Sequence, residues 1–456
     1  MRGGKSFLLL LVLAAAIGGY AYFVESKNEP GGLDGAAKRE KVFAVESEKI
    51  DEMTITSDKG EVTKVKKENN TWKIVSPAAL ESDPAEVSAI TTALAGLERE
   101  KVIDEKPASL KEFTLEPARI SVTFHVAGET GTHRLDVGVK TPVGAELYAK
   151  VDDKPAVFLI GAYREDALNK STFNLRDKTV LTFDRDAANF LKIDDGKKPT
   201  AIAKTNSQWR LTAPIETAAD FTAADGLVSR LYQARMKAFV ADDGTADLKK
   251  YGLDKPQVVV TVGAGSARAA LALGAKTEDG NVYARDLSRP MIFALESALL
   301  DDLKRPAAEL RMKDIFEFRT FTALSIDVTH GGQTYTFARQ TQPADGSPGE
   351  WKLTKPADKA LDTTKSNDML VNFSSLRADS FIDAASAGPE TTVTAKFGQA
   401  SAPQTETVSF RVIPAKGKDG TVTVHAMRKG EKGAMVLSAL EFDKAMAVFK
   451  ELTGAK

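Results

Sequence analysis

Trp72-Lys73-Ile74-Val75-Ser76-Pro77 is a six-residue phrase that this chain repeats twice more. The other copies are Trp209-Arg210-Leu211-Thr212-Ala213-Pro214 and Trp351-Lys352-Leu353-Thr354-Lys355-Pro356, and together the three phrases hold every tryptophan of the chain. They recur at intervals of about 140 residues, the size of a common protein domain. Recurrence at a fixed long interval is the sequence signature of a repeat architecture. Most of the 456 residues therefore form one domain-sized unit that occurs three times.

Each phrase has the pattern of a half-buried strand. The tryptophan and the residue two positions later face one side, and the basic residue between them faces the other, until proline ends the strand. We interpret the tryptophans as core anchors, because a packing anchor is needed in every repeat. The alternative is that they are stacking platforms for sugars or peptides. The structural anchors predicted from the phrases are Trp72, Pro77, Trp209, Pro214, Trp351 and Pro356.

An aspartate follows each tryptophan by eleven residues, at Asp83, Asp220 and Asp362. Asp83 precedes Pro84, which is the pattern of a helix N-cap followed by proline in the first helical position. Small or apolar residues follow at helical spacing, so we predict one main amphipathic helix per repeat, packed on a sheet. The corresponding positions in the three copies are Val87, Ile90, Leu94 and Leu97; Ala224, Leu227, Leu231 and Ala234; and Ser366, Met369, Phe373 and Leu376.

The predicted fold class is α+β: an N-terminal transmembrane helix followed by three tandem homologous modules, each a mostly antiparallel sheet with one main amphipathic helix. The predicted modules span residues 42–181, 182–316 and 317–456. The first two stay in step beyond the helix, whereas the third diverges. We align its His425-Ala426 with Tyr148-Ala149 and Tyr283-Ala284 of the other copies.

The N-terminus carries an uncharged run at residues 6–24, preceded by Arg2 and Lys5. A helix over this run would be about 28 Å long, enough to cross a hydrocarbon core. Preceding positive charges favour a cytoplasmic N-terminus. We therefore predict a single-pass protein of the cytoplasmic (inner) membrane: residues 1–5 a cytoplasmic tip, 6–24 the anchor, 25–41 a flexible stalk, and the bulk periplasmic or extracytoplasmic. The alternative is a signal peptide cleaved after Gly19-Tyr20-Ala21.

Composition narrows the function classes. The formal net charge is -1 with acids and bases interleaved, which argues against a nucleic-acid partner. Cysteine is absent, which excludes disulfides, thiolate metal sites and cysteine nucleophiles. We predict no cofactor, no metal and no catalytic residue.

Two sequence patterns suggest ligand sites but have simpler explanations. Gly263-Ala264-Gly265 follows a predicted strand and resembles the start of a dinucleotide loop, yet Arg268 stands where the third glycine belongs. We expect a hairpin turn there. His125 and His133 flank another predicted turn, and we expect a surface pair rather than a zinc site.

Charged residues also mark the predicted junctions between copies. We interpret Arg176 with Asp177, and Arg311 with Asp314, as junction salt bridges. The alternative is that these residues contact an anion or a partner protein.

These motifs together resemble an uncharacterised bacterial group, the domain-of-unknown-function family numbered 4340. The resemblance covers roughly residues 42–380. It is carried by the three tryptophan phrases with their aspartates, by Tyr251-Gly252-Leu253-Asp254-Lys255-Pro256 and by Leu175-Arg176-Asp177-Lys178. It implies a membrane-anchored envelope protein, often found near ABC transporter components of the gliding-motility type. The family has no established activity, cofactor or catalytic residue, so none is carried over.

We therefore expect a non-enzymatic accessory or interaction module of an envelope complex, such as an ABC transporter. Two alternatives remain open at this point. One is a cell-envelope hydrolase that acts on glycan or peptide in a cleft between modules. The other is a structural spacer.

Overall fold

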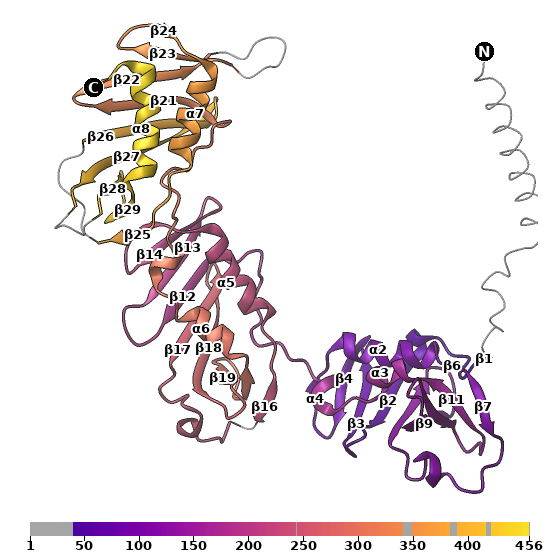
Figure 1. Ribbon diagram of the computed structural model, residues 1–456. Coiled ribbons are helices and arrows are strands. Elements are labelled where there is room, and N and C mark those ends of the chain that lie inside the picture. Colours follow the sequence, from indigo (N-terminus) through magenta and orange to yellow (C-terminus); the bar gives the residue numbers. More distant parts are fainter. Residues whose placement is uncertain (1–39, 243, 341–348, 384–389, 416–420, 456) are drawn as a thin grey trace, which may run out of the picture. The chain divides into compact units, whose positions relative to one another are not determined.

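The computed structural model describes residues 40–242, 244–340, 349–383, 390–415 and 421–455 (Figure 1). The predicted membrane anchor at residues 6–24 and nearly all of the predicted stalk lie outside these ranges. Within them, no helix combines the length and the apolar character needed to cross a membrane. The chain divides into two compact units, one ending at Lys178 and the other beginning at Thr179.

The first unit contains a nine-stranded sheet in the order β5-β4-β3-β2-β8-β9-β10-β11-β7, and each pair of neighbouring strands is antiparallel. Helix α2 (Pro84–Ala95) packs on the sheet (Figure 1). The strands are β2 (Ile50–Thr56), β3 (Val62–Glu68), β4 (Thr71–Ser76), β5 (Leu80–Glu81), β7 (Lys101–Asp104), β8 (Ile120–Val126), β9 (Thr132–Lys140), β10 (Glu146–Val151) and β11 (Val157–Gly161). The unit also contains β1 (Glu40–Lys41), β6 (Glu98–Arg99), α3 (Glu165–Leu168) and α4 (Thr172–Leu175).

This sheet consists of two meanders that meet in its middle. Strands β2 to β5 run outward from the centre in one direction, and β8 to β11 run outward in the other, with β2 paired to β8. Between the meanders the chain passes through α2 and places β7 at the far edge, against β11. The helix therefore lies on the connection between opposite edges of the sheet.

The second unit contains two more sheets with the same order of strands. We call the three sheets with their helices modules 1, 2 and 3. Module 2 has β12 (Phe190–Asp194), β13 (Thr200–Thr205), β14 (Gln208–Ala213), β15 (Thr217–Ala218), α5 (Phe221–Gln233), β16 (Ala238–Ala241), β17 (Val258–Ala264), β18 (Ala267–Lys276), β19 (Val282–Asp286), β20 (Ile292–Leu295), α6 (Ser297–Leu303) and the 3₁₀ helix η7 (Ala307–Leu310). Module 3 has β21 (Ala323–His330), β22 (Gln333–Arg339), β23 (Trp351–Lys355), β24 (Lys359–Ala360), α7 (Thr363–Ser374), β25 (Ser380–Ile382), β26 (Thr391–Gln399), β27 (Ala402–Ile413), β28 (Thr423–Arg428), β29 (Ala434–Ser438) and α8 (Ala439–Thr453).

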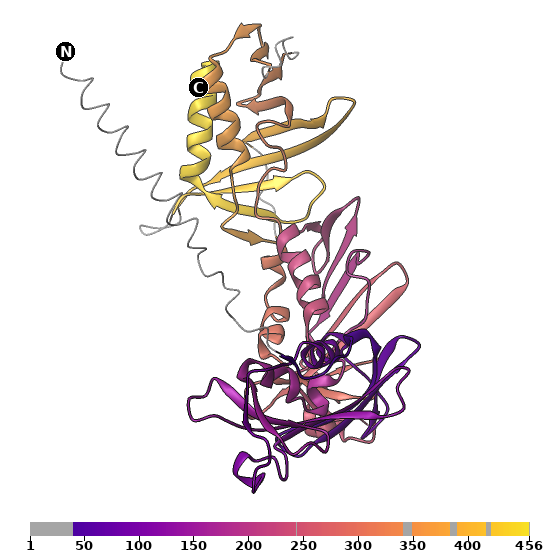
Figure 2. The ribbon, with the colours of Figure 1, turned by 90° about the vertical axis from the view of Figure 1, so that its right-hand side faces the viewer.

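Module 3 diverges in sequence but keeps the topology of the other two. His425 pairs with Val436, as Tyr148 pairs with Leu159 and Tyr283 with Ala294. Its main structural difference is the last helix. Helix α8 is continuous and lies beside α7, whereas module 2 has the shorter α6 followed by η7 (Figures 1 and 2).

The cores show where each module begins. Val180 and Leu181 pack in the core of module 2, and Ile315 and Phe316 pack in the core of module 3. The cores of modules 2 and 3 therefore include residues that lie just before positions 182 and 317. Val180 and Leu181 directly precede residue 182, where module 2 was predicted to begin, and Ile315 and Phe316 directly precede residue 317, where module 3 was predicted to begin.

The three tryptophans lie in β4, β14 and β23 and face the cores. Trp72 is 7% exposed, Trp209 is 2% and Trp351 is 4%. The prolines that end the phrases, Pro77, Pro214 and Pro356, each follow a cis peptide bond.

The three aspartates lie at the N-termini of the main helices. The Asp83 carboxylate accepts a hydrogen bond from the backbone N–H of Ala85 at 3.0 Å. Asp220 accepts one from Ala223 at 2.9 Å, and Asp362 one from Lys365 at 2.8 Å. Of the twelve positions predicted to face the sheet, nine lie in the three helices and are buried. The last of each set lies just past the end of its helix: Leu97 and Leu376 are buried there, and Ala234 is partly buried.

Candidate binding cleft at the junction of modules 2 and 3

Modules 2 and 3 share a buried polar contact centred on Glu431, which follows β28. Its Oε2 accepts a hydrogen bond from the Thr217 hydroxyl at 2.6 Å, and its Oε1 accepts one from the Ala218 backbone N–H at 3.1 Å. The Arg428 guanidinium lies 3.5 Å from the same carboxylate, and the two side chains are only 8% and 11% exposed. Buried charges need such partners, so this contact holds module 3 against the β15 edge of module 2.

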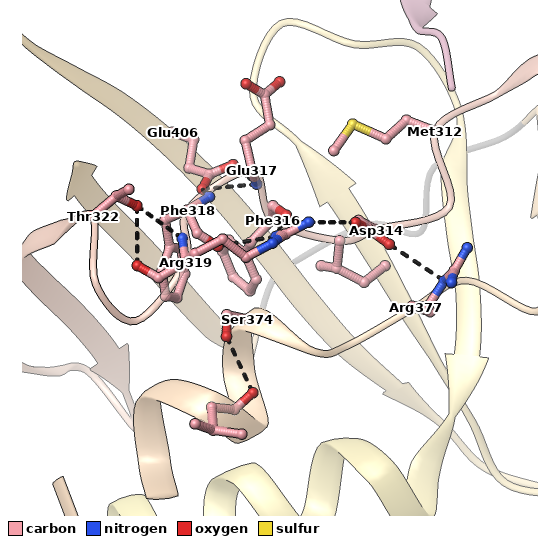
Figure 3. Close-up of polar contacts among 12 residues, drawn as sticks. Met312, Asp314, Phe316, Glu317, Phe318, Arg319, Thr322, Ser374, Arg377 and Glu406 are labelled. Atoms are coloured by element: carbon pink, nitrogen blue, oxygen red, sulfur yellow. Dashed lines mark hydrogen bonds and ion pairs between the residues drawn. The ribbon is translucent and has the colours of Figure 1, made fainter. Parts of the chain in front are cut away.

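The segment that enters module 3, residues 314–318, is held by the side chains of Arg428 and Glu406. Arg428 donates to the backbone carbonyls of Asp314 and Ile315. Glu406 on β27 accepts hydrogen bonds of 2.9 Å from the backbone N–H groups of Glu317 and Phe318 (Figure 3). Burial raises the pKa of the Glu406 carboxyl, while these two hydrogen bonds oppose the rise.

In module 2 an arginine that is paired with an acid also binds the backbone of the entering segment, but the acid precedes the arginine in the chain, whereas in module 3 it follows. Arg289 forms an ion pair with Asp286 at 2.8 Å and donates to the backbone carbonyls of Thr179 and Val180. By strand register, Asp286 corresponds to Arg428, and Arg289 therefore corresponds to Glu431. In module 3 the acid, Glu431, therefore stands at the position that Arg289 holds in module 2. From there its carboxylate reaches Thr217 and Ala218 of module 2.

The predicted ion pair between Arg311 and Asp314 is wrong. Asp314 instead pairs with Arg319 at 2.6 Å and with Arg377 at 3.3 Å (Figure 3). The Arg311 guanidinium lies 4.0 Å from the centre of the Phe381 ring, and burial lowers the pKa of this guanidinium. The segment is extended, and side chains three positions apart on an extended segment point to opposite faces.

At the end of module 1, the structure buries Arg176 to 8% exposure. Arg176 forms an antiparallel bridge with Ser82, and the backbone N–H of Asp177 donates to the Glu81 carbonyl at 2.9 Å. These residues thus lie on the edge of the sheet of module 1.

A cleft of about 420 Å³ opens at the junction of modules 2 and 3. Module 2 contributes Trp209 and Phe221, the connecting segment contributes Arg319, and module 3 contributes Phe397. A neighbouring hollow of about 390 Å³ shares Asp314 and Arg319 with the cleft. The remaining residues of this second hollow are Thr320, Phe321, Val371, Ser374, Ser375 and Arg377.

The two hollows combine exposed apolar groups with guanidinium groups. Phe321 is 79% exposed, Phe221 is 53% and Val371 is 49%. Arg319 and Arg377 both form ion pairs with Asp314. Aromatic and arginine side chains are the types most enriched at the energetic centres of protein interfaces.

The two sequence patterns that suggested ligand sites form a hairpin turn and two histidine–carboxylate pairs. Gly263 and Ala264 are the last two residues of β17 and Gly265 has a φ of 56°, so this glycine segment forms the β17–β18 hairpin. His125 bonds to Asp51 at 2.7 Å, and His133 bonds to Glu129 at 2.9 Å. Over the ranges that the structure describes, no group of three or more His, Cys, Asp or Glu side chains could hold a metal ion.

Sequence reasoning missed the residues that build the junction. They are Glu406, Arg428, Glu431, Arg319 and Arg377. One signal was available for two of them: counting from the aligned His425-Ala426 pair reveals the reversed charges at positions 428 and 431.

A family model described as Domain of unknown function (DUF4340) matches residues 72–208 and 209–396. The two matched segments begin at Trp72 and Trp209, the first residues of two repeated phrases. No curated protein matches the chain. Since the matched residues make up more than half of its length, the chain belongs to the DUF4340 family of domains of unknown function.

Proposed function

We propose that this protein is a membrane-tethered binding module that docks a protein partner on the outer side of the cytoplasmic membrane. The partner would be a component of an envelope complex, such as an ABC transporter, and the module would catalyse no reaction of its own. The observation that carries the proposal is the cleft between modules 2 and 3. Together with the neighbouring hollow, it presents Phe221, Phe321 and Val371 beside Arg319 and Arg377 on a junction held by buried contacts.

The acids around the cleft support binding rather than catalysis. Asp314 is paired with two arginines, and Asp220 caps α5. Glu317 accepts a hydrogen bond from the Gln208 side chain at 3.2 Å. General acid–base chemistry needs a carboxyl that is free to exchange a proton with a substrate. These three carboxyls instead serve local structure.

The membrane tether rests on the uncharged run at residues 6–24 and the basic residues before it. A tether would keep the cleft close to a membrane-embedded partner and raise its effective concentration. The proposed transporter link rests on the family resemblance.

The test is site-specific photo-crosslinking of the full-length protein in its native membranes. A benzophenone amino acid would replace Phe321 in one variant. In the control it would replace Val143, which is 89% exposed and belongs to module 1. We expect a transporter subunit to be crosslinked from position 321 and not from position 143, and only when residues 6–24 are present. Equal crosslinking from both positions, or none from position 321, would contradict the proposal.

A further inference from the structure

The edge of the sheet in module 1 is covered by the chain segment that leaves the module. The backbone N–H of Asp83 donates to the Leu175 carbonyl at 2.8 Å, and the backbone N–H of Asp177 donates to the Glu81 carbonyl at 2.9 Å. These two bonds flank an antiparallel bridge between Ser82 and Arg176. Ser82 is consequently only 6% exposed.

Module 2 repeats this arrangement position by position. The backbone N–H of Asp220 donates to the Leu310 carbonyl at 2.8 Å, and that of Met312 donates to the Ala218 carbonyl at 3.0 Å. They flank a bridge between Ala219 and Arg311, and Ala219 is 7% exposed. Covering the edge in this way satisfies backbone groups that would otherwise be open to pairing with another chain.

The corresponding edge of module 3 is β24. Its Ala360 pairs with Lys352, as Glu81 pairs with Lys73 and Ala218 with Arg210. By this register, the outward acceptor is the Ala360 carbonyl and the outward donor is the Asp362 N–H. Within the described ranges, neither group has a backbone partner from a segment beyond β24. Lys359 and Ala360 are exposed, and Leu361 is partly exposed.

The reason lies in α8. Leu452 lies 16 residues after Val436, and Leu175 and Leu310 lie 16 residues after the equivalent Leu159 and Ala294. All three leucines are buried. Here, however, the leucine belongs to a continuous helix, so its carbonyl accepts from the Lys359 ammonium at 3.0 Å instead of from Asp362. The helix then closes through Gly454, whose N–H donates to Lys450. The leucine position is filled, but among the residues that the structure describes no strand pairs with the outer side of β24.

We propose that the outer edge of β24 binds an extended segment of a partner protein, added to the sheet as an antiparallel strand. The two segments that cover the edges of modules 1 and 2, residues 175–177 and 310–312, define the chemistry of this partner segment. One backbone N–H would donate to the Ala360 carbonyl, and a backbone carbonyl two residues earlier would accept from Asp362. The residue between them would lie opposite Leu361 and would be arginine, as at Arg176 and Arg311. Strand addition of this kind draws its affinity from main-chain hydrogen bonds. This surface is distinct from the cleft between modules 2 and 3.

The probe is a synthetic peptide with the sequence of residues 309–315, which includes the segment that covers the edge of module 2. Because the chain contains no cysteine, a single introduced thiol reports one position. The peptide would carry cysteine in place of its arginine, activated as the mixed disulfide with thiopyridine, and the full-length protein would carry Leu361→Cys, whose thiolate would displace thiopyridine from the peptide. We expect a disulfide to form at least about tenfold faster than with Val143→Cys, since a templated thiol has an effective concentration in the millimolar range. Equal rates for the two variants would overturn the proposal.

A second measurement leaves the protein unchanged and so does not depend on the folding of a variant. It compares N-methylated forms of the fluorescent peptide for binding to the full-length chain, followed by anisotropy. Methylation of the amide at the Met312 position removes the donor for Ala360 and should abolish binding. Methylation at the Lys313 position, whose amide points away from the edge, should leave binding intact. Equal binding of both methylated peptides, or no binding of the unmethylated peptide, would refute strand addition.

Discussion

Glu431 of module 3 accepts a 2.6 Å hydrogen bond from the hydroxyl of Thr217 in module 2, and the two residues are 214 positions apart in the chain. The same carboxylate also takes the Ala218 N–H and the Arg428 guanidinium. Three donors on one buried acid make this the contact on which the junction depends. The cleft beside it is formed by residues of both modules, so its shape depends on Glu431 as well.

Glu431→Ala should lower the free energy of unfolding of the second unit by about 3 kcal/mol. The substitution leaves Arg428 buried without its acid and the Thr217 hydroxyl without its acceptor. Urea denaturation of the full-length protein measures the change.

The matched control is Glu441→Ala, which removes an acid that is paired with Lys444 on the exposed face of α8. Exposed pairs of this kind contribute less than about 1 kcal/mol. If both variants unfold at the same urea concentration, the contact at Glu431 does not hold the modules together.

The elements that sequence analysis predicted correctly depend on local patterns. Trp209 and Leu211 share one face of a strand because side chains alternate along it. Asp220 caps α5 because a carboxylate can reach backbone N–H groups only a few residues ahead. Such relations involve neighbours in the chain, so spacing alone is enough to find them.

The elements that it missed depend on contacts between distant residues. The placement of β7 beside β11 and the pairing of β2 with β8 require the whole sheet, which no local pattern specifies. Asp314 forms an ion pair with Arg377 because the segment that enters module 3 lies against the residues that follow α7. Module 3 appeared divergent because its side chains had changed, although its strand order had not.

Trp209→Ala should lower the free energy of unfolding by about 3 kcal/mol or more, because it leaves a large cavity in the core of module 2. Circular dichroism during urea denaturation gives the value. Phe321→Ala serves as the control, since a side chain that is 79% exposed should change stability by less than about 0.5 kcal/mol. A Trp209→Ala protein that keeps its stability but loses its partner would favour the stacking-platform alternative.

Asp220→Ala should lower the free energy of unfolding by about 1 kcal/mol, because the backbone N–H of Ala223 loses its cap. Asp220→Asn keeps an oxygen acceptor in the same place and should stay within a few tenths of a kcal/mol of the wild type. Thermal or urea denaturation can compare the two. Equal losses in both variants would show that charge, rather than the capping bond, accounts for the effect.

The stability of the second unit should depend on pH through Glu406. Burial raises the pKa of this carboxyl above its ordinary value of 4.5, so the folded state holds the proton more tightly than the unfolded state does. The contribution of this group to stability is therefore fully present below pH 4.5, and it is lost as the pH rises through the raised pKa.

Glu406→Gln removes the titration and keeps an oxygen that can accept from Glu317 and Phe318. Urea denaturation from about pH 4 to pH 8 should therefore show the variant gaining stability relative to the wild type as the pH rises. Other acids titrate in both proteins, so the difference between the two curves isolates this carboxyl. A constant difference across the range would mean that the two backbone N–H groups stabilise the carboxylate enough to cancel the effect of burial.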